Sequence, residues 1–252
     1  MLTEKERLEL AVLSIMAGEL KPIGSGAVSQ TLVEKGYSFS ESTIGRLFAG
    51  LDRNGYTRRQ GFQGRLITAK GQQRLAYLQF MEERSRYGFR FLNTLDSKEK
   101  KNMIEILVAR RAVERELARL AAMNATKAQL HLLKSICNEH HKSSVGKKVS
   151  AEQDIKFHRL IAHSAGNAVL ASALDLIMQN SQLSPVLEYI RTHVHSSVAD
   201  EHAKILHAIA ENNPDAADQA MVEHLESLIA NVEKYWTRAK DQNKQAHPLF
   251  TD

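Results

Sequence analysis

The segment Ala151–Gly166 carries an aspartate and a histidine at a spacing that suits metal binding. Asp154 and His158 are four residues apart, and the apolar residues around them keep helical spacing. Both side chains should therefore leave the predicted helix on the same face. A carboxylate and an imidazole in this arrangement make half of a site for a divalent cation.

Two further histidines are candidates to complete that site. His202 and His224 each lie within a helical pattern of their own. One carboxylate and three imidazoles form a nitrogen-rich, moderately hard ligand set, which suits zinc, nickel, manganese or iron and leaves positions open for water or a ligand. Taken singly, each of these two histidines fits a buried residue with a hydrogen-bond partner better than a metal ligand.

The order of motifs in the second half of the chain favours the metal site. The motifs are V-A-R-R-A-V-E-R from Val108, D-I-K-F-H from Asp154, H-S-A-G-N from His163 and D-E-H-A-K-I-L-H from Asp200. In this order they resemble the all-helical effector domain of FadR-like transcriptional regulators in the GntR superfamily, over about residues 98–238. The resemblance implies that the four candidate ligands, Asp154, His158, His202 and His224, occupy the family's metal-binding positions.

The same resemblance implies a site for a small organic acid. Arg110 matches a family position that meets the carboxylate of an effector, and the paired N–H donors of a guanidinium suit that group. An ion pair with Glu114, one turn further along the helix surface, explains Arg110 equally well. Asn167 either lines the same pocket or caps the helix that follows it.

The positive charge of the chain is concentrated in its first third. The 252 residues have a formal net charge of +5, and residues 1–90 account for all of it, with 14 Lys and Arg against 9 Asp and Glu. Residues 46–74 alone contain seven basic residues and one acidic residue. This asymmetry favours a polyanionic partner, although a solvated basic face explains it equally well.

Three short helices and a basic hairpin are predicted in this first third. The helical patterns cover Glu4–Ala17, Gly26–Lys35 and Glu41–Asn54. Ser25 and Ser40 are the expected caps of the second and third helices. Tyr56–Thr68 then has the pattern of two short strands joined by a glycine-bearing loop. Together these elements predict a winged helix-turn-helix, whose third helix enters the major groove of DNA.

The outward face of the third helix and the hairpin provide the expected DNA contacts. Arg46 has the two-donor fork that reads guanine, and the hairpin arginines suit phosphate or minor-groove contact. The candidate DNA-binding residues are Ser42, Thr43, Arg46, Arg53, Arg58, Arg59 and Arg65.

This first third does not resemble the usual DNA-binding partner of a FadR-like effector domain. The P-S-E-R-x-L-A and V-R-E-A-L elements expected there are not found. Instead, S-E-S-T-I-G-R-L-F from Ser40 and G-R-L-I-T-A-K-G from Gly64 resemble the winged helix of ribonuclease R-type proteins and of some nitrogen-regulation repressors, over about residues 5–75. An RNA-binding role is the alternative, which we disfavour because no catalytic ribonuclease domain follows.

We predict a mostly α protein with an N-terminal winged helix-turn-helix and a C-terminal all-helical effector bundle. The predicted domains are residues 1–75, a linker helix and junction over 76–101 without a sustained period beyond Arg84, the metal- and effector-binding bundle over 102–240, and a disordered tail over 241–252. The charged N-terminus and the absence of a long apolar run predict a cytoplasmic protein with no membrane partner. Cys137, the only cysteine, excludes an intrachain disulfide.

The predicted function is transcriptional regulation rather than catalysis. We expect a homodimeric regulator, a repressor in our leading hypothesis, that binds double-stranded operator DNA, a divalent transition metal with zinc as the first choice, and a small carboxylate effector. One alternative is a regulator that senses the metal itself. The other is a metal-dependent hydrolase, for which no second carboxylate stands at a suitable spacing to act as general base.

Overall fold

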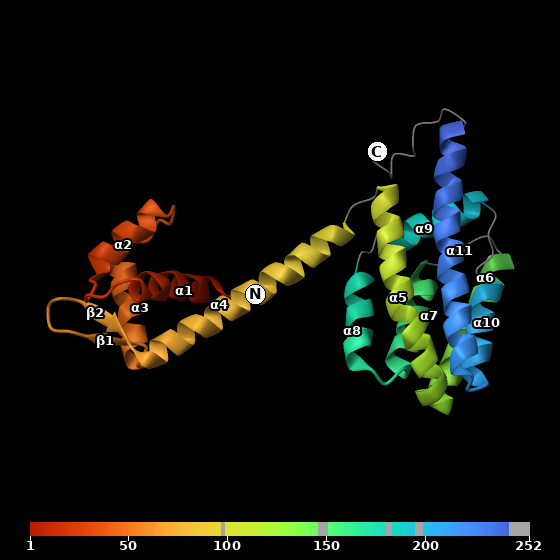
Figure 1. Cartoon of the computed structure of the whole chain (residues 1–252), viewed down its shortest axis with the longest axis horizontal. Coiled ribbons are helices and arrows are strands. Elements are labelled where there is room, and N and C mark those ends of the chain that lie inside the picture. Colours follow the sequence, from red (N-terminus) through yellow and green to blue (C-terminus); the bar gives the residue numbers. More distant parts are fainter. Residues whose placement is uncertain (97–98, 146–150, 180–182, 195–198, 242–252) are drawn as a thin grey trace. The chain divides into compact units, whose positions relative to one another are not determined.

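The computed structural model describes residues 1–96, 99–145, 151–179, 183–194 and 199–241, and it divides the chain into two compact units (Figure 1). The units are Met1–Arg90 and Phe91–Asp252. Helices make up most of the described residues, and the strands form one two-stranded sheet. The predicted fold class is confirmed, and each unit is described by itself below.

The first unit is a winged helix-turn-helix followed by a long helix. Its elements are α1 (Glu4–Ala17), α2 (Ser25–Glu34), α3 (Glu41–Arg53), β1 (Thr57–Arg59), β2 (Arg65–Ile67) and most of α4 (Ala69–Leu95). From Phe91 onward α4 belongs to the second unit, in whose core Leu95 is buried. The first three helices each turn an apolar stripe into a common core, in which Leu13, Leu32, Ile44 and Phe48 are fully buried. Burial of these stripes holds three short helices together that would be marginal alone.

Helix capping agrees with the sequence at one position and differs at another. Ser40 caps α3 as predicted, because its hydroxyl accepts a hydrogen bond from the Thr43 backbone N–H. Ser25 does not cap α2: Gly24 is the N-cap and Ser25 is the first helical residue. The Ser25 hydroxyl instead donates to Glu41 Oε1 at 3.0 Å, which links the starts of α2 and α3.

The wing is a short antiparallel hairpin anchored to the loop before α2. Thr57 pairs with Ile67 in the hairpin register, and Arg65 also bridges to Ile23 through both backbone hydrogen bonds. Gly64, at φ 122°, lies so close to this loop that a Cβ atom would be 2.5 Å from the Ile23 carbonyl carbon. Glycine is therefore required where the wing crosses the Ile23 backbone.

Helix α4 extends further than the sequence pattern predicted. The helix continues to Leu95, so most of the junction beyond Arg84, for which the sequence shows no sustained period, is helical. Leu75 and Leu78 near its start are buried in the core of the first unit. Arg74 pairs with Glu9 at 3.0 Å, which ties the start of α4 to α1.

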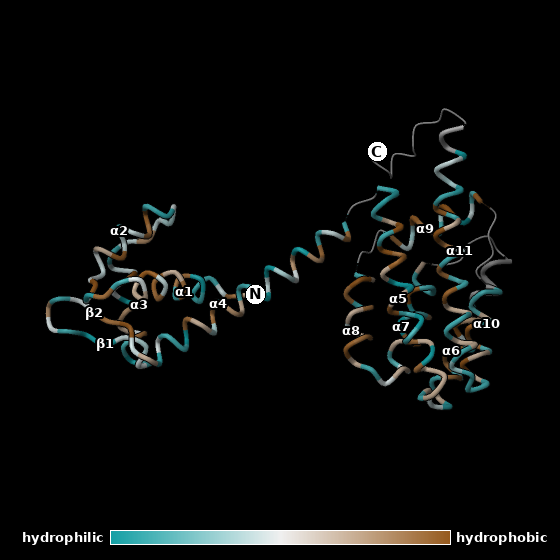
Figure 2. The backbone as a smooth tube through the Cα atoms, in the orientation of Figure 1, coloured by the Kyte–Doolittle hydropathy of each residue, from teal (hydrophilic) through white to brown (hydrophobic). Residues whose placement is uncertain are grey.

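The second unit is a bundle of seven helices within the described residues. They are α5 (Lys100–Asn124), α6 (Lys127–Val145), α7 (Ala151–Ser164), α8 (Ala168–Ile177), α9 (Leu183–Val194), α10 (Ala199–Ala210) and α11 (Pro214–Asp241). The two long helices α5 and α11 run side by side (Figure 1), and α8 is apolar along most of its length (Figure 2). A continuous apolar core joins the seven helices.

Some sequence expectations fall at or beyond the limits of the described residues. The predicted disordered tail lies outside them from residue 242 onward. None of the helices described combines the length and the apolar character needed to cross a membrane. At the end of α7, Gly166 adopts a φ of 72°, which lets the chain turn directly into α8.

The thiol of Cys137 should be unreactive in the folded protein. Its side chain is buried in the bundle, and burial raises the pKa of the thiol to about 12. Because the thiolate is the reactive form, a disulfide-exchange reagent such as DTNB should not modify the native chain at pH 8. The denatured chain should release one equivalent of the coloured product, measured by absorbance. Rapid modification of the native protein would contradict the burial of this side chain.

Candidate metal centre

Four side chains from three helices of the second unit converge on one point. Asp154 and His158 come from α7, His202 from α10 and His224 from α11, and each offers a ligand atom within 4.8 Å of the others. All four are buried. Residues that are 70 positions apart in the sequence thus form a single cluster.

The size of the cluster matches the coordination shell of a transition-metal ion. Asp154 Oδ1 lies 3.7 Å from His158 Nε2 and 3.5 Å from His202 Nε2. Bonds of about 2.0–2.2 Å from zinc to nitrogen and oxygen place neighbouring ligand atoms roughly 3–4 Å apart. The two distances fit neighbouring ligands of one ion, and all four candidate ligand atoms lie within 4.8 Å of one another.

Two carboxylates turn the imidazoles so that Nε2 faces the cluster. Glu114 Oε2 on α5 lies 2.5 Å from His158 Nδ1, and Glu201 Oε2 on α10 lies 2.8 Å from His224 Nδ1. A carboxylate beside Nδ1 accepts a hydrogen bond from the Nδ1–H group. It therefore favours the imidazole tautomer whose lone pair is on Nε2, the atom that binds a metal. Among the described residues, His158 Nε2, His224 Nε2 and Asp154 Oδ1 have no hydrogen-bond partner.

Burial keeps two of the imidazoles neutral. It lowers the pKa of His202 well below the usual value, and the neighbouring His224 lowers it further. Burial also lowers the pKa of His224, to about 4, against the opposing effect of its hydrogen bond with Glu201. A neutral imidazole is the form that binds a metal ion, so at pH 7 neither ring has to lose a proton first.

The carboxylates of the cluster stay ionised although they are buried. Burial raises the pKa of Asp154, but the positive charge of Arg191, with a smaller effect of Arg110, holds the pKa below the usual range. Burial likewise raises the pKa of Glu114, and Arg110 and His158 bring it down to about 2. The site therefore presents negative charge to a cation at neutral pH.

Two buried arginines border the cluster. Arg110 Nε donates to Glu114 Oε1 at 2.6 Å with both side chains 1% exposed, so the pair is made in the interior and not on the helix surface as the sequence suggested. Arg191 on α9 lies 3.7 Å from Asp154. In the described part of the chain, Arg110 Nη2 and Arg191 Nε and Nη2 lack hydrogen-bond partners. Buried donors without partners are costly in the interior.

Three residues of this environment were not identified from the sequence as part of the site. Glu114 was considered only as a surface partner of Arg110, and Arg191 and Glu201 were not considered. Arg191 carries a signal, because it follows Ile190 and precedes Val194 on the buried face of an amphipathic helix. A charged residue on an apolar helix face needs a buried partner, which here is Asp154.

Asn167 caps a helix, which is one of the two roles that the sequence left open. Its side-chain oxygen accepts a hydrogen bond from the Leu170 backbone N–H at 3.1 Å and so caps α8. Its capping role is sufficient to explain the residue.

The candidate DNA-binding residues lie in the first unit, and most are exposed. Ser42, Arg46, Arg53, Arg58 and Arg59 are exposed, and Thr43 is half-buried. The hydroxyls of Ser42 and Thr43 both lie 2.9 Å from that of Ser40, within the N-terminal cap of α3. These residues place positive charge along α3 and β1, where the sequence predicted it.

Arg65 has a structural role in the same unit. Its Nε donates to Asp52 Oδ2 at 2.8 Å, and its guanidinium lies 4.8 Å from the centre of the Phe48 ring. Asp52 also accepts a hydrogen bond from the Thr57 hydroxyl at 2.5 Å. Arg65 therefore braces the wing against α3, which the sequence did not predict.

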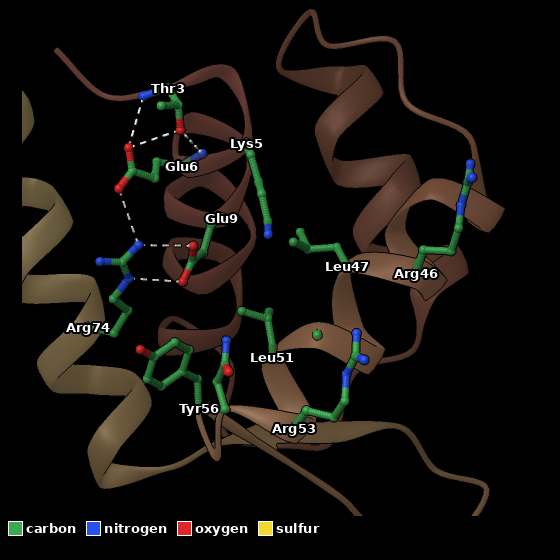
Figure 3. A pocket seen from close by; sticks show the side chains of 12 residues that line it. Thr3, Lys5, Glu6, Glu9, Arg46, Leu47, Leu51, Arg53, Tyr56 and Arg74 are labelled. Carbon is green, nitrogen blue, oxygen red and sulfur yellow. Dashed lines mark hydrogen bonds and ion pairs between the residues drawn. The ribbon is translucent and has the colours of Figure 1, made fainter.

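A surface hollow of about 440 Å³ lies between α1, α3 and the start of α4 (Figure 3). Arg46 and Arg53 approach it from α3, and on the opposite side Arg74 is held by Glu6 and Glu9 (Figure 3). Because both Glu9 oxygens accept from Arg74, this guanidinium joins α4 to α1 and is not available to a ligand.

Comparison with known families identifies both parts of the chain. Residues 105–227 match the FCD domain, and residues 10–75 match the ribonuclease R winged-helix domain.

Several curated proteins are similar to the chain over part of its length. The HTH-type transcriptional repressor NanR of Citrobacter rodentium is 33% identical over 137 residues, covering 52% of this chain and 50% of that protein. The Exu regulon transcriptional regulator of Escherichia coli is 28% identical over 127 residues, covering 49% and 48%. The putative L-lactate dehydrogenase operon regulatory protein of E. coli is 26% identical over 164 residues, covering 64% and 61%. The chain thus spans about half the length of the first two relatives.

Solved structures similar to the chain include a Streptococcus agalactiae GntR protein and McbR/YncC of E. coli. The first has a TM-score of 0.45 and 21% identity, covering 90% of this chain and 99% of that one. The second has a TM-score of 0.45 and 16% identity, covering 94% and 100%. These overall scores are too low to support a conclusion.

Replacement of His202 or His224 by alanine should abolish metal binding at the cluster. The His202→Ala and His224→Ala variants should lose most of the metal that copurifies with the wild-type chain, measured by inductively coupled plasma mass spectrometry. Their melting temperatures should no longer respond to a chelator, because binding to the native state alone stabilises it. The control is His207→Ala, an exposed histidine on the same helix as His202. Metal content equal to that of the control would refute the ligand assignment.

Glu201 should tune metal affinity without being a ligand. The Glu201→Gln substitution keeps the shape of the side chain but removes the charge that orients His224. We expect metal affinity about 10–100-fold weaker, the usual effect of losing a carboxylate behind a metal-binding histidine. Competition with a chromophoric chelator measures this change. An unchanged affinity would reduce the Glu201–His224 contact to a purely structural one.

Proposed function

The chain belongs to the GntR-type regulators that carry an FCD domain, and on that premise we propose that it is a ligand-responsive, DNA-binding transcriptional regulator. The observation that carries the proposal is the buried Asp154, His158, His202 and His224 cluster in the FCD domain of a chain whose other unit is a basic winged helix. One unit binds a small ligand and the other binds double-stranded operator DNA.

The four clustered side chains hold a divalent transition metal in this proposal, with zinc as the first choice and nickel, manganese or iron as alternatives. Three imidazole nitrogens and one carboxylate oxygen suit these ions. When bound, the cation supplies positive charge and an open coordination position for an oxygen of the effector. Glu114 and Glu201 hold two of the imidazoles in the orientation that such an ion requires.

The effector we propose is a small organic acid. The unpaired N–H groups of Arg110 and Arg191 are buried beside the cluster, and a guanidinium fork matches a carboxylate. Binding of the acid would satisfy donors that are otherwise unsatisfied in the interior, which favours an anion over a neutral ligand.

The effector would act by changing the relative stability of two arrangements of the bundle. The groups that surround it come from α5, α7, α9, α10 and α11, so its binding bears on most of the helices in the unit. A ligand shifts such an equilibrium only by the difference between its affinities for the two states. Roughly 1–3 kcal/mol of coupling gives a usable switch.

The proposed DNA complex is that of a homodimer on a palindromic operator. The exposed arginines of α3 and β1 fit the phosphate and base contacts of a winged helix. The name of the relative NanR as a repressor favours repression over activation. A cytoplasmic location is part of the same proposal, since the operator is there.

Two other functions are less well supported. A metal-dependent hydrolase needs a general base, but in the described residues the two carboxylates behind the ligands, Glu114 and Glu201, are both engaged by imidazoles. A metal sensor remains the second candidate, because the same four ligands would serve it. The two unpaired arginines favour an acid as the signal.

The arginines of α3 should carry the affinity for DNA. The full chain should enrich a duplex sequence from a random pool, and Arg46→Ala/Arg53→Ala should bind that duplex about 10–100-fold more weakly in fluorescence anisotropy. The slope of log affinity against log salt should fall by about two, one for each lost charge. The control is Lys101→Ala, an exposed lysine of the second unit. If the double variant binds like the control, α3 is not the recognition helix.

Titration of the DNA complex separates an acid-responsive regulator from a metal sensor. The metal-loaded chain should change its affinity for the selected duplex when small organic acids are added, and Arg191→Ala should abolish the response while retaining the metal. Mass spectrometry under native conditions measures metal retention in that variant. A response to metal removal alone, with no response to any acid, would favour the sensor.

A further inference from the structure

Helix α4 carries a stripe of exposed aromatic side chains whose described contacts are with polar groups of the same helix. The Arg74 guanidinium lies 5.5 Å from the centre of the Tyr77 ring, the Arg84 guanidinium lies 5.5 Å from that of Phe80, and the Tyr87 hydroxyl lies 3.5 Å from Glu83. Tyr77, Phe80, Tyr87 and Phe91 are 50%, 56%, 59% and 39% exposed. Soluble proteins seldom leave several large apolar side chains exposed along one line, and such a stripe marks an interaction surface. The α4 tube alternates polar and apolar colours along its length (Figure 2).

The spacing of the stripe is that of a coiled coil. With Arg84 included, the positions are 77, 80, 84, 87 and 91, which alternate by three and four residues. These are the a and d positions of two successive heptads. The stripe lies well away from Leu75 and Leu78, which face the core of the first unit. We call Tyr77, Phe80, Arg84, Tyr87 and Phe91 the α4 seam.

We propose that the α4 seam pairs with the α4 seam of a second copy of this chain, in antiparallel orientation. In a parallel pair each a residue would meet its own copy, so Arg84 would face the partner's Arg84. In the antiparallel pair Arg84 meets the partner's Tyr87, and Phe80 meets the partner's Phe91. The antiparallel pair therefore places the Arg84 guanidinium against an aromatic ring, whereas the parallel pair would place two guanidinium groups against each other.

The charges beside the seam favour the same orientation. Glu83 and Arg90 occupy the g positions, and in the antiparallel register Glu83 of one copy lies opposite the partner's Arg90. The two-fold axis makes this contact twice. In a parallel pair the same residues would lie opposite Gly88 and Leu95, which carry no charge. Arg86 and Tyr87 contact Glu83 within one helix at 3.5 Å, so the carboxylate already lies at the edge of the seam.

Gly88 fits this pairing and has no other explanation in the described residues. A Cβ atom at this position would have nothing within 4 Å, yet glycine inside a helix costs roughly 1 kcal/mol relative to alanine. In the antiparallel register Gly88 occupies an e position opposite the partner's Met81. Met81 packs against the core of its own unit, so the missing side chain at Gly88 leaves the edge of the seam open for close approach of the two helices.

The pairing locates part of the homodimer contact of the proposed function. Two heptads are too short for an independent coiled coil, so the seam would be only one part of the dimer contact. Because Arg74 fixes the start of α4 to α1, the pairing would also set the spacing of the two winged helices. The pairing of the two seams is tested in the absence of DNA. A negative result would therefore not contradict the proposed DNA binding.

Site-specific disulfides in the full chain test the orientation. Cys137 is buried, so introduced cysteines are the reactive ones. Phe80→Cys and Phe91→Cys, co-expressed with different tags and oxidised, should form the mixed 80–91 disulfide. Like positions would be about 16 Å apart in the antiparallel pair, from the helix rise, and should not crosslink. The control pair is Glu82→Cys with Phe89→Cys, which has the same axial register on the opposite helix face.

Each outcome of this experiment decides the proposal. Disulfides between like positions would show a parallel pair, and a yield of mixed disulfide no higher than the control would mean that something else covers the seam. Both results overturn the proposal.

A charge reversal tests the predicted contacts of Glu83 and Arg90. Added to the cysteine variants, Glu83→Arg turns both symmetric contacts from attractive to repulsive, and we expect pairing about tenfold weaker, read from the concentration dependence of the disulfide yield. Glu83→Arg/Arg90→Glu should recover the original yield. A double variant as weak as the single one would overturn the antiparallel register.

Discussion

The second unit depends on the burial of charged groups that water cannot reach. Asp154 and Glu114 stay ionised in the interior because the guanidinium groups of Arg191 and Arg110 lie beside them. An isolated charge in such a place would cost several kcal/mol, so removal of any single partner leaves the others uncompensated. Five of the seven helices contribute to the cluster, and its charge balance therefore constrains the arrangement of the bundle.

The cluster is better suited to binding than to stability. Well-packed apolar residues of similar volume are often as stable as a buried ion pair or more so. Here the unpaired atoms, Nε2 of His158 and His224 and Oδ1 of Asp154, face each other, and the unpaired arginine N–H groups lie beside them. A cation satisfies the first group and an anion the second. Because these groups belong to different helices, binding of either proposed ligand would affect the arrangement of the bundle.

The first unit uses its charged residues in two distinct ways. Arg65 and Arg74 are held by Asp52 and Glu9 and serve to fix the wing and α4 to the rest of the unit. Arg46, Arg58 and the other exposed arginines remain available to a partner. A count of basic residues does not separate these roles, because it contains no information on which guanidinium already has a carboxylate beside it.

The pattern along the sequence determined the helices, the hairpin and the candidate ligands. Apolar residues at helical spacing predict α1, α3 and α5 well because each stripe must face a core whatever its partner is. The same pattern did not predict that α4 continues beyond Arg84, because the exposed stripe of this helix faces away from the core of the first unit and contains Arg84. It also did not reveal Arg191 and Glu201, because their significance arises only from neighbours on other helices. Spacing along the chain is a local property, whereas the convergence of Asp154, His202 and His224, and the choice of Arg65 as a brace, depend on contacts between segments far apart in sequence, and only the tertiary structure decides those.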